Sequence, residues 1–240
     1  MKLVCDGVIS SKGLELSEPV MLLNDAASLG TYGLQDALDL SGNGNDLKTA
    51  NEFTATGMTV VEDTEHGADT GIIDTDEFSF VVCLNVDKPT TALGGIIFSN
   101  LIPDTPPYNG VQLRILPDGT VWLQVANASP TGPDDNTFQF SAGGSVGGWT
   151  RYSGTISTSK QLMTITRAGG QTASVKMPTR AKGVRGIRIN GALSTSKNMG
   201  LNGVIGCIAF YNRILSSEEQ AEMRDNMKFA IMQERGVVVP

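Results

Sequence analysis

A predicted hairpin over residues 111–125 carries the side chains whose types and spacing best suit ligand binding. Apolar and polar residues alternate along both arms, and this period of two places them on opposite faces of the hairpin. The polar face carries Gln112, Arg114, Trp122 and Gln124. A sugar is often held in this way, with its C–H groups against an aromatic face and its hydroxyls bonded to amide and charged groups. These four residues are therefore the first candidate binding site.

A second interpretation of Trp122 stays open, in which the ring lies under a loop or packs on a neighbouring subunit. Large apolar side chains at a surface commonly mark protein contacts. Tyr108, in the proline-rich segment before the hairpin, is a candidate contact at the rim of the same site. The alternative for Tyr108 is a loop residue that faces solvent.

Acidic residues crowd the segment between residues 62 and 77. Carboxylates and backbone carbonyls in irregular loops are the oxygen ligands that calcium requires. We therefore consider a calcium site formed by Asp63, Asp69, Asp74 and Asp76. A solvated acidic loop explains the same residues without a metal, and the sequence indicates no other cofactor.

Composition argues against several kinds of partner. A formal net charge of -7 disfavours nucleic acid or an anionic membrane. No stretch approaches the roughly 20 apolar residues that span a bilayer, so we expect no membrane insertion, and residues 1–13 lack the pattern of a signal peptide. The three cysteines, Cys5, Cys83 and Cys207, are widely spaced and predict reduced thiols and synthesis in a cytoplasm.

Short strands separated by glycine- and proline-containing turns must position these residues. The expected strands lie over residues 19–23, 53–61, 78–86, 95–99, 111–115, 121–125, 138–140, 149–156, 162–167 and 184–189, with one more that ends at 177. The 240 residues contain no internal repeat and no low-complexity linker. Many short strands with regular turns therefore predict one sandwich domain.

The stretch Leu201–Glu219 (LNGVIGCIAFYNRILSSEE) is the one around which the other elements are organised. Residues 204–211 are mostly apolar on both faces of an extended chain, which predicts a central strand covered on each side. Ser216 with Glu219 three residues later forms a capping box. We therefore expect a helix over Ser217–Arg235.

Two segments resemble a known family. Tyr211–Glu219 (YNRILSSEE) is similar to the closing segment of laminin-G-like, concanavalin A-like jelly-roll domains, and Asp39–Leu47 (DLSGNGNDL) is similar to a turn near their first strands. Asn43 and Asn45 match that turn, where we expect them to shape the loop and to bond its backbone. Trp149 resembles a core tryptophan of the family and is expected to pack in the interior.

The resemblance implies an all-β fold, in which two antiparallel sheets lie face to face in a concanavalin A-like jelly roll with a C-terminal α-helix outside. It implies one domain over residues 17–240, including the helix at 217–235, and leaves residues 1–16 as an N-terminal arm or edge strand. Lectins of this fold bind sugar on the concave face of a sheet, so the resemblance implies a binding face that includes Trp122.

Glucanases of the same fold carry an E-x-D-x-E run that points alternate carboxylates into a cleft. Retaining hydrolysis needs two carboxyl groups about 5 Å apart. The nearest run in this chain, Asp74–Glu77 (DTDE), lacks both glutamates at that spacing. His66 is the single histidine, and no G-x-S-x-G motif accompanies it. We therefore expect no enzymatic activity and no catalytic residues.

By the same resemblance we expect a non-catalytic binding or adhesion module that recognises a glycan or a cell-surface polymer. An adhesion-type fold made in the cytoplasm without a signal peptide is similar to bacteriophage virion proteins of the tail or capsid surface. This implies action in the virion, with other virion subunits or further copies of the chain as partners. Two alternatives stay open: a purely structural decoration or assembly protein that binds no glycan, and a glycoside hydrolase.

Overall fold

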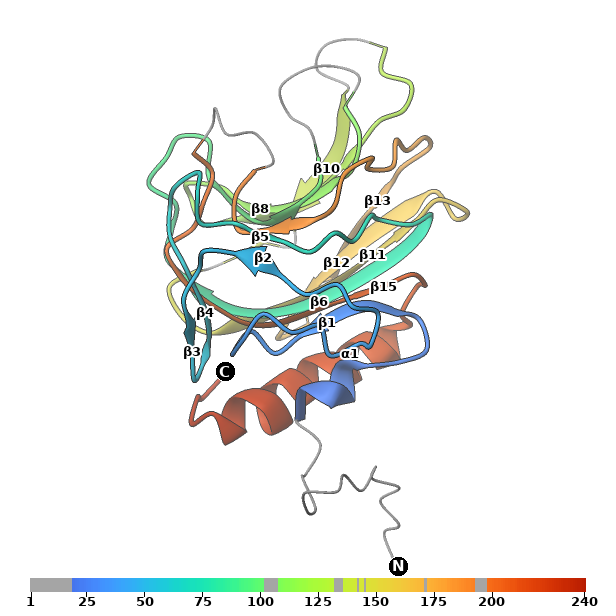
Figure 1. Cartoon of the computed structure of the whole chain (residues 1–240). Coiled ribbons are helices and arrows are strands. Elements are labelled where there is room, and N and C mark those ends of the chain that lie inside the picture. The colour runs from blue at the N-terminus through green and yellow to red at the C-terminus, as the bar shows by residue number, and fades with distance from the viewer. Residues whose placement is uncertain are drawn as a thin grey trace, which may run out of the picture.

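The computed structural model describes residues 19–101, 108–131, 136–141, 143–144, 146–170, 172–192 and 198–240. These residues form two antiparallel sheets that lie face to face, with a helical layer against the outer face of one sheet (Figure 1). The predicted fold class, an all-β jelly-roll sandwich with a C-terminal helix, is confirmed. The predicted arm over residues 1–16, together with Cys5, lies outside the described residues, and the domain boundary stays a prediction.

The larger sheet has eight strands in the described part of the chain. Along the sheet the order is β13 (Thr172–Lys176), β12 (Leu162–Arg167), β11 (Thr150–Ser157), β6 (Glu77–Val86), β15 (Gly203–Tyr211), β4 (Gly57–Val60) and β3 (Phe53–Thr54). The eighth strand, β1 (Ser28–Tyr32), pairs with the second half of β15, beyond the part that pairs with β4. The strand predicted to be central is therefore flanked on both edges.

The smaller sheet has seven strands among the described residues. Their order is β10 (Thr137–Ser141), β9 (Val121–Ala126), β8 (Val111–Ile115), β7 (Gly95–Ser99), β14 (Arg188–Ile189), β5 (Ala68–Asp69) and β2 (Lys48–Thr49). Neighbours along the chain pair as hairpins from β7 to β10, whereas β14 inserts between β7 and β5 from far along the chain. This sheet positions the candidate binding residues.

Interlocking phenylalanine rings hold the two sheets together. Phe98 of β7 lies between Phe80 and Phe210 of the larger sheet, with ring centroids 4.9 Å and 5.3 Å apart in edge-on contacts. Gly154 on β11 leaves room for this cluster, because a Cβ there would lie 2.6 Å from the Phe80 ring. The core is thus packed too closely for a side chain at that position.

The helical layer covers the other face of the larger sheet (Figure 1). It consists of α1 (Ser217–Asn226), the π-helix η2 (Met227–Met232) and the 3-10 helix η1 (Pro19–Leu23). The Tyr211 hydroxyl donates a hydrogen bond of 2.6 Å to the carbonyl of Leu23, which links β15 to η1. No helix in the described residues is long and apolar enough to cross a membrane.

The predicted start of the C-terminal helix is confirmed in detail. The Glu219 backbone N–H donates to the Ser216 hydroxyl at 3.2 Å, and the Ser216 N–H donates to the Glu219 carboxylate at 2.7 Å. Both bonds of the capping box are therefore present. Trp149 also takes its predicted packing role, because a Cβ at Gly206 on β15 would lie 2.9 Å from its ring.

One predicted strand is wrong, and two more are wrong in part. Pro19–Leu23 is a 3-10 helix, since Val20 and Leu23 are buried three residues apart while the two residues between them are exposed, which is the period of that helix. Residues 53–61 are a hairpin of β3 and β4, which turns before Gly57 at φ +148. Only Arg188–Ile189 of the strand expected over 184–189 pairs in a sheet.

In the turn over Asp39–Leu47, the asparagines bond backbone groups, as the resemblance implied. The Asn43 and Asn45 side-chain amides donate to the carbonyls of Ser28 and Leu29 at 2.7 Å and 2.9 Å. Asp39 accepts hydrogen bonds from three backbone N–H groups of the same loop and of β1. These bonds fix the loop against β1, so the asparagines serve loop geometry.

Candidate functional site

The seven-stranded sheet turns its outer face away from the helical layer (Figure 1). Alternate residues of β8 and β9 fill the core between the sheets, so the residues between them face outward. Gln112 lies opposite Gln124, and Arg114 lies opposite Trp122. The predicted hairpin is confirmed, and the four candidate residues of its polar face lie together.

The first of two cross-strand rows on this face is the glutamine row, which we define as Ser99, Gln112, Gln124 and Gln139. The Gln112 amide donates to the Gln124 carbonyl oxygen at 2.7 Å, and the Gln124 amide donates in turn to that of Gln139. The Ser99 hydroxyl bonds the Gln112 oxygen at 3.4 Å. Side-chain amides on three neighbouring strands, with a hydroxyl on the fourth, are thus held in fixed orientations.

Exposure changes along the glutamine row. Gln139 on the edge strand is exposed, whereas Gln124 and Gln112 are 7% and 3% exposed. Buried amide groups of this kind need hydrogen-bond partners, and the row supplies them internally. The exposed end of the row is the one from which a solute reaches it.

The second row is the tryptophan row, which we define as Ile96, Arg114, Trp122 and Ser141. Trp122 is partly exposed and has the Arg114 guanidinium on one neighbouring strand and the small Ser141 on the other. Ile96 joins Ala192 and Met199 in a small buried apolar cluster outside the main core. An aromatic ring and a cation therefore stand beside the amides of the glutamine row.

Arg114 is held in place by neutral acceptors. Its Nη1 lies 3.5 Å from the Gln124 side-chain oxygen, and its Nη2 donates to the Leu93 carbonyl. Its buried Nε has no hydrogen-bond partner. Burial lowers the pKa of Arg114, yet a guanidinium stays charged at neutral pH.

Tyr108 is not brought into the tryptophan row. It precedes β8, whereas Arg114 lies near the end of that strand, so the whole of β8 separates them. Tyr108 is partly exposed. The structure thus assembles four of the five predicted ligand-binding residues and leaves Tyr108 at the far end of the strand.

Sequence reasoning missed Gln139, Ser99 and Ser141. A signal for Gln139 exists, because Phe138 and Phe140 on either side of it pack against the core and so turn it outward. Ser99 and Ser141 carry no such signal, since their places in the rows depend on the pairing register of β7 and β10.

Two residues of the predicted calcium site belong to ion pairs. Asp74 pairs with Arg180, and both side chains are at most 1% exposed. Asp74 also accepts hydrogen bonds from the Asn100 side chain and from the Gly183 backbone. Asp76 pairs with Lys182 at 3.1 Å on the surface.

The other two predicted calcium ligands lie elsewhere. Asp63 pairs with the His66 ring and accepts from the backbone N–H groups of Glu65 and His66. Burial raises the Asp63 pKa, but these hydrogen bonds outweigh it and lower the value. Asp69 is exposed on β5. Among the described residues, no three His, Cys, Asp or Glu side chains form a group that could hold a metal ion, so a calcium site stays a prediction without geometric support.

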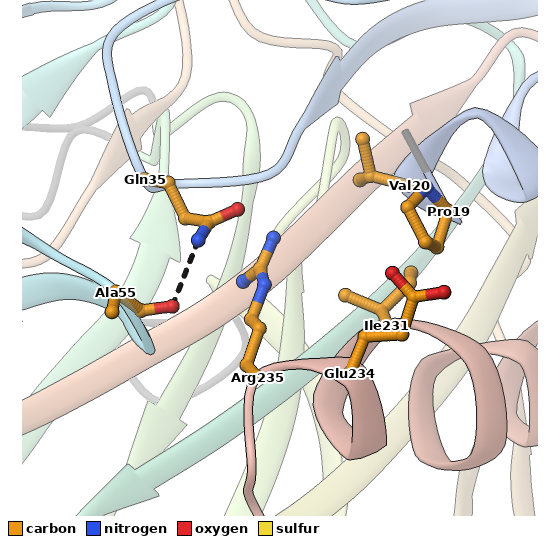
Figure 2. Close-up of a pocket in the computed structure, with 7 residues that line it drawn as sticks. All are labelled: Pro19, Val20, Gln35, Ala55, Ile231, Glu234 and Arg235. Atoms are coloured by element: carbon orange, nitrogen blue, oxygen red, sulfur yellow. Dashed lines mark hydrogen bonds between the residues drawn. The ribbon is translucent and has the colours of Figure 1, made fainter. Parts of the chain in front are cut away.

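A cavity of about 410 Å³ lies on the helical side of the larger sheet. The two rows lie on the other sheet. Figure 2 shows Gln35 and Arg235 entering it from opposite sides, with Glu234 and Ile231 on the helical wall. The Gln35 amide donates to the Ala55 carbonyl at 2.9 Å, and Arg235 donates to the Gly206 carbonyl at 2.7 Å. These side chains tie loops and helix to the larger sheet, which is a structural role.

Comparison with known proteins bears on the fold. No protein-family model matches the chain, and no curated protein is similar to it in sequence. Solved structures are similar, among them the binding domain of Paraclostridial Mosquitocidal Protein 1, with a TM-score of 0.59, 12% identity and coverage of 83% of this chain and 52% of that one.

Two neurotoxin domains are similar to the same extent. The botulinum neurotoxin serotype G binding domain has a TM-score of 0.60 and 12% identity, covering 85% of this chain and 54% of that one. The serotype D ligand binding domain, solved in complex with N-acetylneuraminic acid, has a TM-score of 0.58 and 13% identity, covering 83% and 51%. The chain spans about half the length of these domains, and at such identity the likeness shows the fold alone.

Proposed function

We propose that this chain is a non-catalytic module that binds a glycan on the outer face of the seven-stranded sheet. Trp122 serves as the stacking platform, and Arg114 supplies hydrogen bonds together with Gln139, the exposed end of the glutamine row. The observation that carries the proposal is the pairing of the partly exposed Trp122 with Arg114 directly beside an ordered set of side-chain amides.

The chemistry of the two rows suits a sugar. A pyranose presents C–H groups on one face and hydroxyls around its edge, so it needs an apolar platform and several donors and acceptors. An amide offers both a carbonyl acceptor and an NH₂ donor. Because the row holds its amides in fixed orientations, less side-chain entropy is lost when a ligand binds.

The comparisons are consistent with a binding role, since the similar structures named above are binding domains and one holds N-acetylneuraminic acid. A hydrolase on this face would need two carboxyl groups close together. The side chains of the glutamine row are three neutral amides and a hydroxyl, with no carboxyl group among them. These observations support the non-catalytic form of the proposal.

Replacement of Trp122 tests the proposal. We expect Trp122→Ala to weaken binding at least about tenfold on a glycan array and in titration calorimetry, because the stacking surface is lost. Trp122→Phe should retain most of the affinity. Phe229→Ala is a matched control, since Phe229 is exposed on the helical side. Equal binding by wild type and Trp122→Ala would reject this site.

A second proposal, from another class, is a structural assembly protein that binds no glycan. The observation that favours it is the pair of exposed apolar side chains Phe229 and Val238 beside the helical layer, 60% and 89% exposed. A stable oligomer in light scattering that dissociates in Phe229→Asp, with no binding on the array, would support it. Cytoplasmic synthesis is proposed from the three widely spaced cysteines, and a place in a bacteriophage virion is proposed from the sequence resemblance only.

A further inference from the structure

We infer that the glycan is acidic and that Arg114 binds its carboxylate. This inference rests on the proposed binding face and narrows its ligand to one chemical class. It follows from three features of Arg114: its unused donors, its lack of an acidic partner, and its neighbours in the two rows.

The donors of Arg114 are only partly used. A guanidinium has five N–H donors in a planar fork. In the structure Nη2 donates to the Leu93 carbonyl, Nη1 makes a long contact of 3.5 Å with Gln124, and the buried Nε has no partner. Each Nη nitrogen carries two N–H groups and makes one contact, so a donor remains on each of them at the end of the fork, where a carboxylate can accept with both oxygens.

Arg114 also lacks a counter-charge. In the described part of the chain, Arg180 pairs with Asp74, and Arg213 pairs with both Asp25 and Glu219. No described acidic side chain lies within 4.0 Å of Arg114, although the side chain is half-buried and burial lowers its pKa. A partly desolvated cation is costly without a partner, so an anionic ligand group gains by supplying one.

The neighbours of Arg114 favour a single negative charge on a sugar. Ile96 and Trp122 flank it on the adjacent strands, and neutral amides fill the next row. Arg188 on β14 lies opposite Ser99, two strands from Arg114, and donates to the Thr64 carbonyl. The site beside Trp122 therefore compensates one charge, as a carboxylate carries. The Trp122 ring is placed to cover the sugar that bears this group.

Matched pairs of probes separate this inference from the proposed function. The probes are 3′-sialyllactose with lactose, and galacturonic acid oligomers with their carboxyl-reduced forms, which keep the ring and replace the carboxylate by a hydroxymethyl group. We expect the acidic member of at least one pair to bind at least about tenfold more tightly. We expect Arg114→Gln to abolish this preference while it keeps residual binding to the neutral member.

Two variants assign the effect to Arg114. Arg114→Lys keeps the charge without the fork and should retain only part of the preference. Arg188→Gln is the matched control. Arg188 lies on β14, on the same outer face as Arg114 but two strands away from β8. Thermal unfolding of each variant shows whether it folds.

The outcomes are distinct. Equal affinity for acidic and neutral members, stronger binding of sulfated than of carboxylated sugars, or a preference that survives Arg114→Gln would overturn this inference and leave the proposed function standing. Loss of the preference in Arg188→Gln instead of Arg114→Gln would also overturn it. No binding across neutral and acidic glycans would reject the proposed function itself.

Discussion

At the scale of single residues, Asp74 shows how a pattern of acidic residues misleads. Its neighbours in sequence are acidic, which favours a cation site, yet the structure gives Asp74 the guanidinium of Arg180 from a segment over a hundred residues later. Arg180 also donates to the carbonyls of Thr75 and Asp76 at 2.7 Å and 3.1 Å. The buried pair therefore fastens that distant segment to the entry of β6.

We predict that Asp74→Asn lowers the free energy of unfolding by about 3–5 kcal/mol, because it leaves the Arg180 charge buried without compensation. Chemical denaturation with urea measures the change. Asp76→Asn is the control, since its pair with Lys182 is 46% and 61% exposed, and such surface pairs are worth about 1 kcal/mol or less. An equal loss of unfolding free energy in both variants would show that the buried pair stabilises the fold no more than the surface pair.

The residue scale also shows what sequence can and cannot predict about the site. Alternation along β8 and β9 placed Gln112, Arg114, Trp122 and Gln124 on one face, because the side-chain period of a strand is fixed by its geometry. Alternation also turns Gln139 outward, but the pairing of Gln139 and Ser99 with these residues depends on strand order and register, which local patterns do not encode.

At the scale of elements, the capping box of α1 was predictable because its bonds join residues three apart. Its link to the rest of the molecule was not. Arg213 bonds Glu219 at 2.8 Å and also pairs with Asp25, almost the whole chain away. Contacts between distant segments also explain why the strand predicted at η1 is wrong. Its apolar run fits a strand locally, but it packs on β15 as a 3-10 helix.

The cap gives a prediction for pH dependence. The hydrogen bond from Arg213, with that from the Ser216 backbone, lowers the pKa of Glu219 from 4.5 to about 2. A carboxylate whose pKa is lower in the folded state stabilises the fold above its unfolded pKa, and this contribution disappears as the pH falls toward the folded value. Glu219→Gln should therefore be less stable than wild type at pH 7.

The difference between wild type and Glu219→Gln should shrink between pH 4.5 and about 2. Urea unfolding of both proteins at several pH values in this window measures it. Ser216→Ala is a useful comparison, because loss of an N-cap costs about 1 kcal/mol and leaves in place the Arg213 hydrogen bond, the largest cause of the low Glu219 pKa. A constant difference between wild type and Glu219→Gln down to pH 2 would contradict the role of this ion pair.

At the scale of the whole molecule, the two-layer architecture was predictable, because many short strands with regular turns are typical of a sandwich or a barrel and two short motifs resemble a sandwich family. The covering of the larger sheet by three helical elements was only partly predictable. Cys83 and Cys207 lie directly opposite each other on β6 and β15 beneath this cover and are free thiols.

The reaction rate of these thiols measures how often the whole protein unfolds. We predict that Cys83 and Cys207 react with an aromatic disulfide reagent only as fast as the protein unfolds, because both are buried and their contact, together with burial, raises the Cys83 pKa. A Cys5→Ser background isolates the pair, and the protein in guanidinium chloride gives the unprotected rate. Rapid reaction of the native protein would show that the helical cover opens locally.

The helical layer and the seven-stranded sheet, which carries the glutamine row, lie on opposite sides of the sandwich (Figure 1). If the protein is attached to a larger particle through its helical layer, the outer face of the opposite sheet is directed away from that particle. Copies fixed side by side in this orientation would meet a long repeating chain at many points at once, so weak individual contacts would add up to tight adherence.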